Sequence, residues 1–252
     1  AMDRLHEDRG PHGLCLCHEG DWNDSLTGVC RRGRGESIWL SMAFCRAAGQ
    51  MRELAERLGN AGLAARMLAW RAEMALAVNA HGWDGEWYLC ALDDDGNPIG
   101  SARNEEGKIF LNMQSWAHLG GIADDARWEV AWAAARRRLD AGWGFMLNWP
   151  AYTRAAPNVG RLSYIRPGGG ENASVYTHGN AFLLLALLER GLADDALAVW
   201  RAINPANPAR PGQSMPNVFY NGFYGPDSEI LPGLADHPWT TGSAAWMLHG
   251  VL

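Results

Sequence analysis

The 252-residue sequence contains no run that approaches the roughly 18 consecutive apolar residues of a membrane-spanning helix. It also lacks a surplus of basic residues, because its formal net charge is −6 at pH 7. The first absence argues against insertion in a membrane, and the second argues against a nucleic-acid partner. The short cluster Arg31-Arg32-Gly33-Arg34 does not reverse this, since charge runs of that length are usually solvated turns.

Paired cysteine motifs are absent as well. The five cysteines are an odd number and none forms a CxxC pair, so the sequence predicts neither a disulfide framework nor a zinc site. This pattern fits a reducing compartment, and we expect a cytoplasmic protein. The first residues, Ala1 to Asp8, are too polar for a signal peptide.

Apolar residues and tryptophan are abundant instead. The chain is 48% apolar, which is enough for one sizeable core, and its 13 tryptophans exceed what packing alone requires. Tryptophan-rich acidic proteins often bind sugars, because an indole stacks on the apolar face of a pyranose. We expect the tryptophans on helices to lie in the core, whereas Trp149 and Trp239 on loops are candidates for stacking on a sugar.

Apolar residues recur at spacings of three and four in seven segments, which predicts a mainly helical chain. The predicted helices cover 36–58, 61–80, 112–121, 124–141, 175–190, 192–203 and 239–250. Residues 86–92 predict a strand that enters a turn at 93–96, so a small β excursion is expected. The segments 143–174 and 204–238 are long loops, and their aromatic content favours a functional role.

The segment Gly20-Asp21-Trp22-Asn23-Asp24-Ser25 places two carboxylates, an amide and an indole just before a predicted helix. A carboxyl group beside a large aromatic ring can be kept protonated by desolvation and can pass its proton to a glycosidic oxygen. We therefore predict Asp24 as a general acid and Asp21 as a residue that orients the loop. Helix-capping carboxylates are the alternative for this pattern taken alone. Calcium does not fit, because the sixth and twelfth loop positions are Leu26 and Arg32, and no metal is predicted.

Several short motifs along the chain share the order seen in one enzyme family. The sequence resembles the inverting disaccharide phosphorylases of glycoside hydrolase family 94, which include cellobiose and chitobiose phosphorylases. The motifs are His12-Gly13-Leu14, Gly20 to Asp24, Gly35-Glu36-Ser37, Asn112 to Ala117, Glu171-Asn172, Tyr176-Thr177-His178 and Trp239 to Ala244. Together they extend over almost the whole chain, which makes the resemblance specific.

The resemblance implies an (α/α)6 toroid, a barrel of twelve helices. Seven helices amount to about half of that barrel, so we expect residues 1–252 to be a single domain, the C-terminal portion of the catalytic barrel. The family's N-terminal β-sandwich and first barrel helices are expected to be absent. Half a toroid leaves inner helices without partners, which predicts an exposed apolar face and association between copies. A homodimer would agree with what is usual in the family.

The activity implied by the resemblance is that of a glycosyltransferase-type phosphorylase. Such an enzyme converts a β-linked glucosyl or N-acetylglucosaminyl disaccharide and phosphate into an α-sugar-1-phosphate and a free sugar, with inversion. The partners are therefore a disaccharide and inorganic phosphate, which is a co-substrate, and no cofactor is expected. By resemblance Asp24 is the acid, and Trp22 and Glu171 contact the sugar. The phosphate-binding residues implied are His178, Thr241 and Gly242.

The residues themselves leave simpler interpretations open. His178 taken alone could be a core histidine, and Thr241-Gly242 could be an ordinary helix start, a role compatible with phosphate binding. Gly168-Gly169-Gly170 stands where several family members have a cationic residue before the glutamate, so the acceptor site differs here.

Two other functions remain as alternatives. An inverting hydrolase on the same fold would need a second carboxylate as base, for which Asp227, Glu229 and Asp236 are candidates. A non-catalytic sugar-binding remnant would keep Trp22 and Glu171 without a complete pocket, and the fragment would then be inactive alone.

Overall fold

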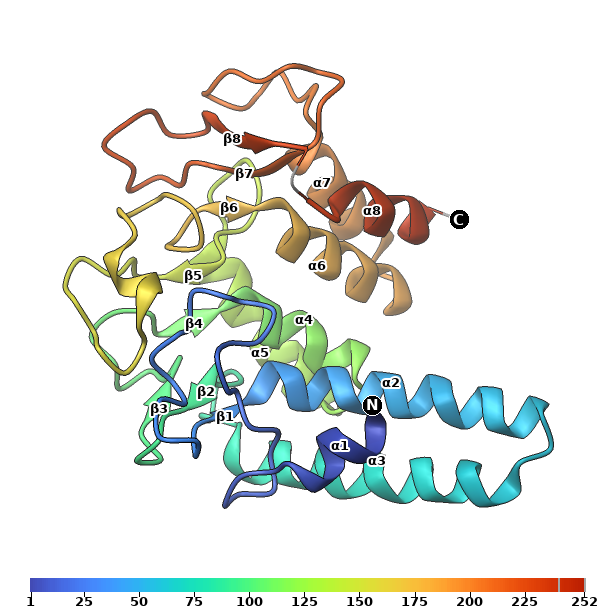
Figure 1. The fold of residues 1–252 in the computed structure, drawn as a ribbon. Helices are drawn as coiled ribbons and strands as arrows, with labels where there is room; N and C mark the ends of the chain where they lie inside the picture. Colours follow the sequence, from blue (N-terminus) through green and yellow to red (C-terminus); the bar gives the residue numbers. More distant parts are fainter. Residues whose placement is uncertain (240, 252) are drawn as a thin grey trace.

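The computed structural model describes residues 1–239 and 241–251, and consecutive helical hairpins dominate it (Figure 1). Side-chain caps fix where three helices begin, because each accepts a hydrogen bond from a backbone N–H group left free in the first turn. These caps are Ser37 before α2 (Ile38–Arg57), Asn60 before α3 (Ala61–His81) and Asp124 before α5 (Asp125–Leu139). A short helix, α1 (Met2–Glu7), precedes them and buries none of its residues.

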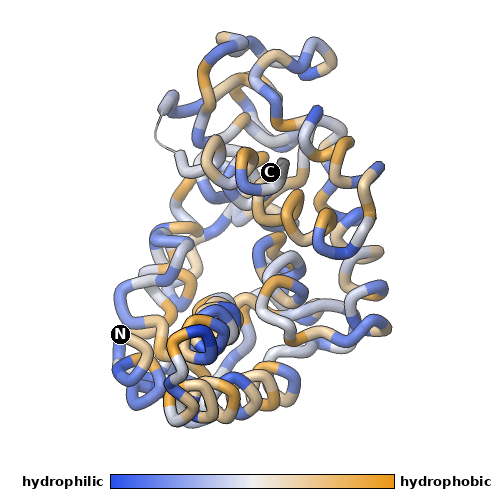
Figure 2. Tube along the Cα trace, turned by 90° about the vertical axis from the view of Figure 1, so that its right-hand side faces the viewer, coloured by the Kyte–Doolittle hydropathy of each residue, from blue (hydrophilic) through white to orange (hydrophobic). Residues whose placement is uncertain are grey.

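The helices form two layers. The inner layer consists of α2, α4 (Leu111–Leu119), α6 (Thr177–Glu189) and α8 (Ser243–Val251), which pack on one another in that order. The outer layer consists of α3, α5 and α7 (Ala193–Ile203), and each packs on the inner helix before it. Nearly every residue of α4 and α6 is buried, because these helices lie between inner neighbours and an outer helix. Figure 2 views the helices nearly end-on, from the α2 and α3 pair at the bottom to the α6 to α8 group at the top.

Short antiparallel strands form three small sheets with the orders β1-β2-β3, β4-β5 and β6-β7-β8. Strands β1, β4 and β6 run directly into the inner helices α2, α4 and α6, so the N-terminal ends of these helices face the strands. Figure 1 shows the strands and the long loops gathered at this one end. The bounds are β1 Glu36–Ser37, β2 Ala91–Leu92, β3 Pro98–Ile99, β4 Ile109–Phe110, β5 Asn148–Trp149, β6 Val175–Tyr176, β7 Tyr220–Phe223 and β8 Ala235–Pro238.

The structure confirms the mainly helical prediction, and each of the seven predicted helices has a counterpart from α2 to α8. The last prediction, 239–250, includes residue 240, which lies outside the described residues, and α8 begins only at Ser243. The predicted strand over 86–92 is wrong for most of its length, since only its last two residues form a strand, although Tyr88 makes an isolated bridge with Trp83. The prediction of a single β excursion is also wrong, because two-residue strands recur before inner helices. Strands this short leave no periodic signal in the sequence.

Candidate active site

The loop that carries Asp24 is held by hydrogen bonds among its own polar residues. The Asp21 carboxylate accepts from the backbone N–H of Asn23 (2.8 Å) and from the Ser37 hydroxyl at the start of α2. The Asn23 side-chain oxygen in turn accepts from the Ser25 N–H (3.3 Å). Burial raises the pKa of Asp21 to about 6, although the hydrogen bonds from Ser37 and Asn23 oppose this shift. Asp21 thus lies within the loop and turns it, as the sequence predicts, while the Asp24 side chain is exposed.

Asp24 lines a cavity of about 230 Å³ at the strand end of the molecule. Glu171 lies in its wall, and Tyr176 of β6, Asn221 of β7 and Asp236 of β8 contribute further side chains. Segments distant in the sequence meet here because β6, β7 and β8 form one sheet. Three carboxyl groups therefore face one cavity, which suits the recognition of sugar hydroxyls and proton transfer.

Glu171 and Asp24 form a coupled pair of carboxyl groups. Glu171 is only 8% exposed, and its Oε2 accepts a hydrogen bond from the backbone N–H of Ser25 (3.3 Å). Burial raises the pKa of Glu171 to about 8, and the hydrogen bond with Asp24 and the charge of Asp24 act in the same direction. Near neutral pH Glu171 is therefore an uncharged acid that can donate a hydrogen bond to Asp24. The sequence predicts that Asp24 is desolvated. The structure instead buries Glu171, whereas Asp24 faces solvent.

Trp22 connects the Asp24 loop to His178 on α6. Its ring packs edge-on against Tyr176, His178 and Phe182, with centroid distances of 5.3, 5.5 and 5.7 Å. Its indole N–H donates to Nδ1 of His178 (3.3 Å), so the neutral imidazole carries its proton on Nε2. Burial lowers the pKa of His178 to about 4, which keeps the ring neutral. The Nε2 atom is buried and has no partner among the described residues, and it is thus an unused donor.

Thr241 and Gly242 lie beside His178, at the beginning of α8. A Cβ on Gly242 would come within 3.0 Å of His178 Cε1, so only glycine lets the backbone approach the ring this closely. The Thr241 hydroxyl accepts from the backbone N–H of Ser243 (3.1 Å) and shares a hydrogen bond with the Ser243 hydroxyl. The Thr241 hydroxyl therefore satisfies one N–H group at the start of the helix, which fits the simpler interpretation, and a helix N-terminus also favours anions.

The six residues predicted from the sequence thus meet in one region and divide into two groups. Asp24 and Glu171 line the cavity, whereas Trp22, His178, Thr241 and Gly242 lie against one another outside its lining. The sequence prediction missed several lining residues, which are Arg161, Tyr176, Asn221, Tyr224 and His237. Tyr176 adjoins the histidine motif and could have been found, but the other four lie in or beside long loops without a periodic pattern.

The structure separates the three candidate bases of the hydrolase alternative. Asp236 lines the cavity with Asp24, and its Oδ1 is 2.7 Å from Nδ1 of His237. Asp227 and Glu229 are exposed and do not line it. Neither of the two loop tryptophans lines it: Trp149 is half-buried in β5, and Trp239 is 70% exposed.

Two general properties of the described residues bear on function. Within residues 1–239 and 241–251, no group of three or more His, Cys, Asp or Glu side chains is placed to hold a metal ion. In the same part of the chain, no helix combines the length and the apolar character that crossing a membrane requires. All five cysteines are free and buried.

Comparison with known proteins identifies similar sequences and folds. The catalytic-domain model of the glycosyl hydrolase 94 superfamily matches residues 1–252. The chain is 39% identical over 248 residues to solabiose phosphorylase of Paenibacillus borealis, covering 97% of this chain and 32% of that protein. It is 38% identical over 254 residues to 3-O-β-D-glucopyranosyl-β-D-glucuronide phosphorylase of the same organism, covering 98% and 32%. The chain thus spans about a third of the length of the curated relatives it matches.

A solved structure shows the same fold with little sequence similarity. The mannosylglycerate hydrolase of family 63 from Thermus thermophilus superposes with a TM-score of 0.67 at 14% identity. The match covers 99% of this chain and 66% of that one, so the whole helical arrangement is shared.

Proposed function

The chain belongs to the glycosyl hydrolase 94 superfamily, and on this basis we propose that it is the part of a catalytic domain that supplies the acid and the phosphate contacts for inverting phosphorolysis of a β-linked disaccharide. In this proposal the two helix layers are about half of an (α/α)6 toroid, and residues 1–252 act as one domain. The substrates are a glucosyl or N-acetylglucosaminyl disaccharide and inorganic phosphate, and no cofactor takes part. The enzyme would work in the cytoplasm as a homodimer.

The observation that carries the proposal is the exposed Asp24 carboxyl in a cavity beside the buried acid Glu171. In the reaction, the Glu171 proton passes to Asp24 through their hydrogen bond, and Asp24 gives a proton to the glycosidic oxygen while the bond from that oxygen to the anomeric carbon breaks. Phosphate forms the new bond to the anomeric carbon from the opposite face, which inverts its configuration. Glu171 is left as a carboxylate, and the pair regains its proton from the newly formed phosphate ester or from solvent. Glu171 would also contact a sugar hydroxyl, and Trp22 would bound the sugar site.

Phosphate would be held at the second group of residues. The Nε2–H of His178 is buried and has no acceptor among residues 1–239 and 241–251, and a phosphate oxygen would supply one. Gly242 brings the start of α8 next to that ring, where backbone N–H groups favour an anion, and the Thr241 hydroxyl is close enough to contribute. Phosphate is already a nucleophilic anion, so this arrangement needs no catalytic base.

The acceptor sugar would lie toward Arg161. This residue lines the cavity with Asp24, and its side chain makes no ion pair with the described part of the chain. One relative is named for a glucuronide, whose carboxylate an unpaired guanidinium would bind. We therefore favour an acceptor that carries a carboxylate over a neutral one. The measurement is the yield from α-glucose-1-phosphate with glucuronate or with glucose as the acceptor.

The hydrolase alternative is represented by one residue, Asp236, which lines the same cavity and could activate a water molecule. Release of sugar-1-phosphate from cellobiose and from N,N′-diacetylchitobiose, with and without phosphate, distinguishes the functions. Phosphorolysis predicts release that requires phosphate and disappears in Asp24→Asn, with Asp227→Asn as a control. Free glucose without phosphate would indicate hydrolysis, and sugar binding without any reaction would indicate the non-catalytic alternative.

A further inference from the structure

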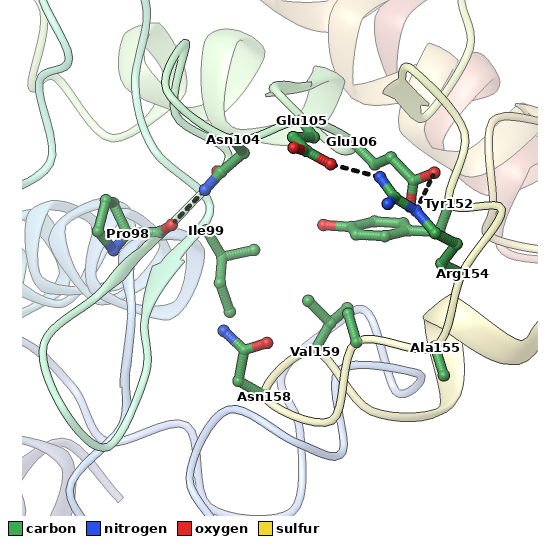
Figure 3. A pocket seen from close by; sticks show the side chains of 11 residues that line it. Pro98, Ile99, Asn104, Glu105, Glu106, Tyr152, Arg154, Ala155, Asn158 and Val159 are labelled. Atoms are coloured by element: carbon green, nitrogen blue, oxygen red, sulfur yellow. Dashed lines mark hydrogen bonds and ion pairs between the residues drawn. The ribbon is translucent and has the colours of Figure 1, made fainter.

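A second cavity, of about 300 Å³, lies between the β3 region and the loop after β5 (Figure 3). We call it the Tyr152 cavity, and the residues used below are Ile99, Glu105, Tyr152, Arg154, Ala155 and Val159. It shares no lining residue with the cavity that holds Asp24. Its volume is at the lower end of the range for small-molecule pockets, which suits one sugar ring better than an oligosaccharide.

The hydroxyl of Tyr152 is a polar group in this cavity that is available to a ligand. The residue is only 5% exposed, and Figure 3 shows its hydroxyl pointing into the cavity. This hydroxyl forms no hydrogen bond with any of the described residues. Because it faces the cavity, this hydroxyl is open to a ligand or to water, either of which would supply its missing hydrogen bond. Gly107, which has a positive φ of 56°, makes the position possible, because a Cβ there would clash with the hydroxyl.

The other walls combine apolar and charged groups. Ile99 and Val159 are buried and present an apolar surface. Arg154 forms an ion pair with Glu105 at the rim, where their side chains are 70% and 81% exposed. A pyranose has a face of C–H groups and a ring of hydroxyls that both donate and accept, so it matches a surface of this kind.

The backbone of Tyr152 is fixed from behind by a buried amide. Asn172 accepts from the Tyr152 N–H (2.8 Å) and donates to the Tyr152 carbonyl (2.8 Å). It also donates to the carbonyl of Ile165 (2.8 Å) and is itself fully buried. The hydroxyl is therefore held in place before a ligand arrives, which lowers the entropy cost of binding.

We propose that the Tyr152 cavity is a binding site for a single neutral monosaccharide, separate from the reaction cavity and held by a hydrogen bond to the Tyr152 hydroxyl. The proposal does not depend on Asp24 or on phosphorolysis. Binding at this site would therefore persist in a chain that has no catalytic activity.

The test is a titration with D-glucose, monitored by ligand-observed NMR suited to weak binding, on the native chain and on variants. Tyr152→Phe removes only the hydroxyl, and we expect the Kd to rise by about fivefold to tenfold. Ala155→Trp places a large ring at an exposed rim position, and we expect it to abolish this binding. The matched control is Tyr164→Phe, since Tyr164 is 66% exposed and does not line the cavity.

Asp24→Asn separates this proposal from the proposed function. Binding that survives in Asp24→Asn and is lost in Ala155→Trp would support a second site, even if the chain proved inactive. The proposal would be overturned by glucose binding that is equal in native, Tyr152→Phe and Ala155→Trp proteins, since the sugar would then occupy another site. For a Kd of about 1 mM, 50 mM glucose is about 50-fold above the Kd and would nearly saturate the site. If the native chain bound no glucose at that concentration, the proposal would also be overturned.

Discussion

Replacement of Glu171 by glutamine should change how the stability of the protein depends on pH. The pKa of this carboxyl rises from 4.5 to about 8 on folding, chiefly because it is buried. Between these values the folded state keeps a proton that the unfolded chain has released, so folding takes up a proton. The contribution of Glu171 to stability is complete below pH 4.5, and it is lost as the pH rises through about 8. Glutamine cannot ionise, but it can still donate a hydrogen bond to Asp24.

The size of the effect follows from the linkage relation. One proton corresponds to about 1.4 kcal/mol for each pH unit, so the native chain should lose about 2 kcal/mol of stability from this group between pH 6 and pH 8. The range from pH 6 to pH 8 is chosen because the pKa of Asp21 is raised only to about 6. The Asp21 carboxyl is therefore largely ionised over most of this range. Asp21 and the histidines are unchanged in Glu171→Gln, so subtracting the two profiles isolates Glu171.

The assay is urea unfolding at pH 6, 7 and 8 of the native chain, Glu171→Gln and the control Glu229→Gln, which alters an exposed glutamate. We expect the free energy of unfolding of Glu171→Gln to gain about 2 kcal/mol over the native chain as the pH rises across this range. The control should follow the native profile. Parallel profiles for all three proteins would refute the reasoning, because they would show that Glu171 ionises in the folded state as it does in the unfolded chain.

Three further predictions concern the phosphate group, the acceptor and the core. Gly242→Ala should raise the KM for phosphate severalfold without unfolding the chain, since the new Cβ pushes on the His178 ring. The control is Gly62→Ala on α3, and an unchanged KM in Gly242→Ala would contradict this phosphate site. Arg161→Gln should lower the rate with glucuronate as acceptor by about tenfold or more and leave the rate with glucose nearly unchanged, and equal losses for both acceptors would contradict the assignment. Trp128→Ala, at a residue that is 1% exposed, should lower the free energy of unfolding by about 3 to 5 kcal/mol in a urea titration, and a loss below 1 kcal/mol would contradict its place in the core.

The helices could be predicted from the sequence, because apolar residues repeat at helical spacing over ten or more residues in most of them. The helix α1 escaped prediction because it has only six residues, and its apolar side consists of Met2 and Leu5, which are too few to show a helical period. The strands escaped prediction for a different reason. A two-residue strand such as β4 shows no alternation, and its partner β5 lies more than thirty residues away in the sequence, beyond the helices α4 and α5.

The candidate site was predicted in part. Short motifs identified Asp24 and Glu171, but they did not reveal that burial would act on Glu171 while Asp24 stays exposed. That difference depends on segment 161–171 folding against the Asp24 loop, a contact between residues 146 apart in the sequence. Arg161 gave no local signal, and the sequence did not distinguish Asp236 from Asp227 and Glu229, since the position of a residue at the cavity depends on tertiary contacts.

The central claim is that Asp24 protonates the leaving sugar while phosphate attacks the opposite face of the anomeric carbon. The most direct test is proton NMR of the sugar-1-phosphate formed from a β-linked glucosyl disaccharide and phosphate, with the native chain and Asp24→Asn compared. The account predicts the α-anomer as the first phosphorylated product of the native chain and none from the variant. A β-anomer, or equal product from both proteins, would contradict it.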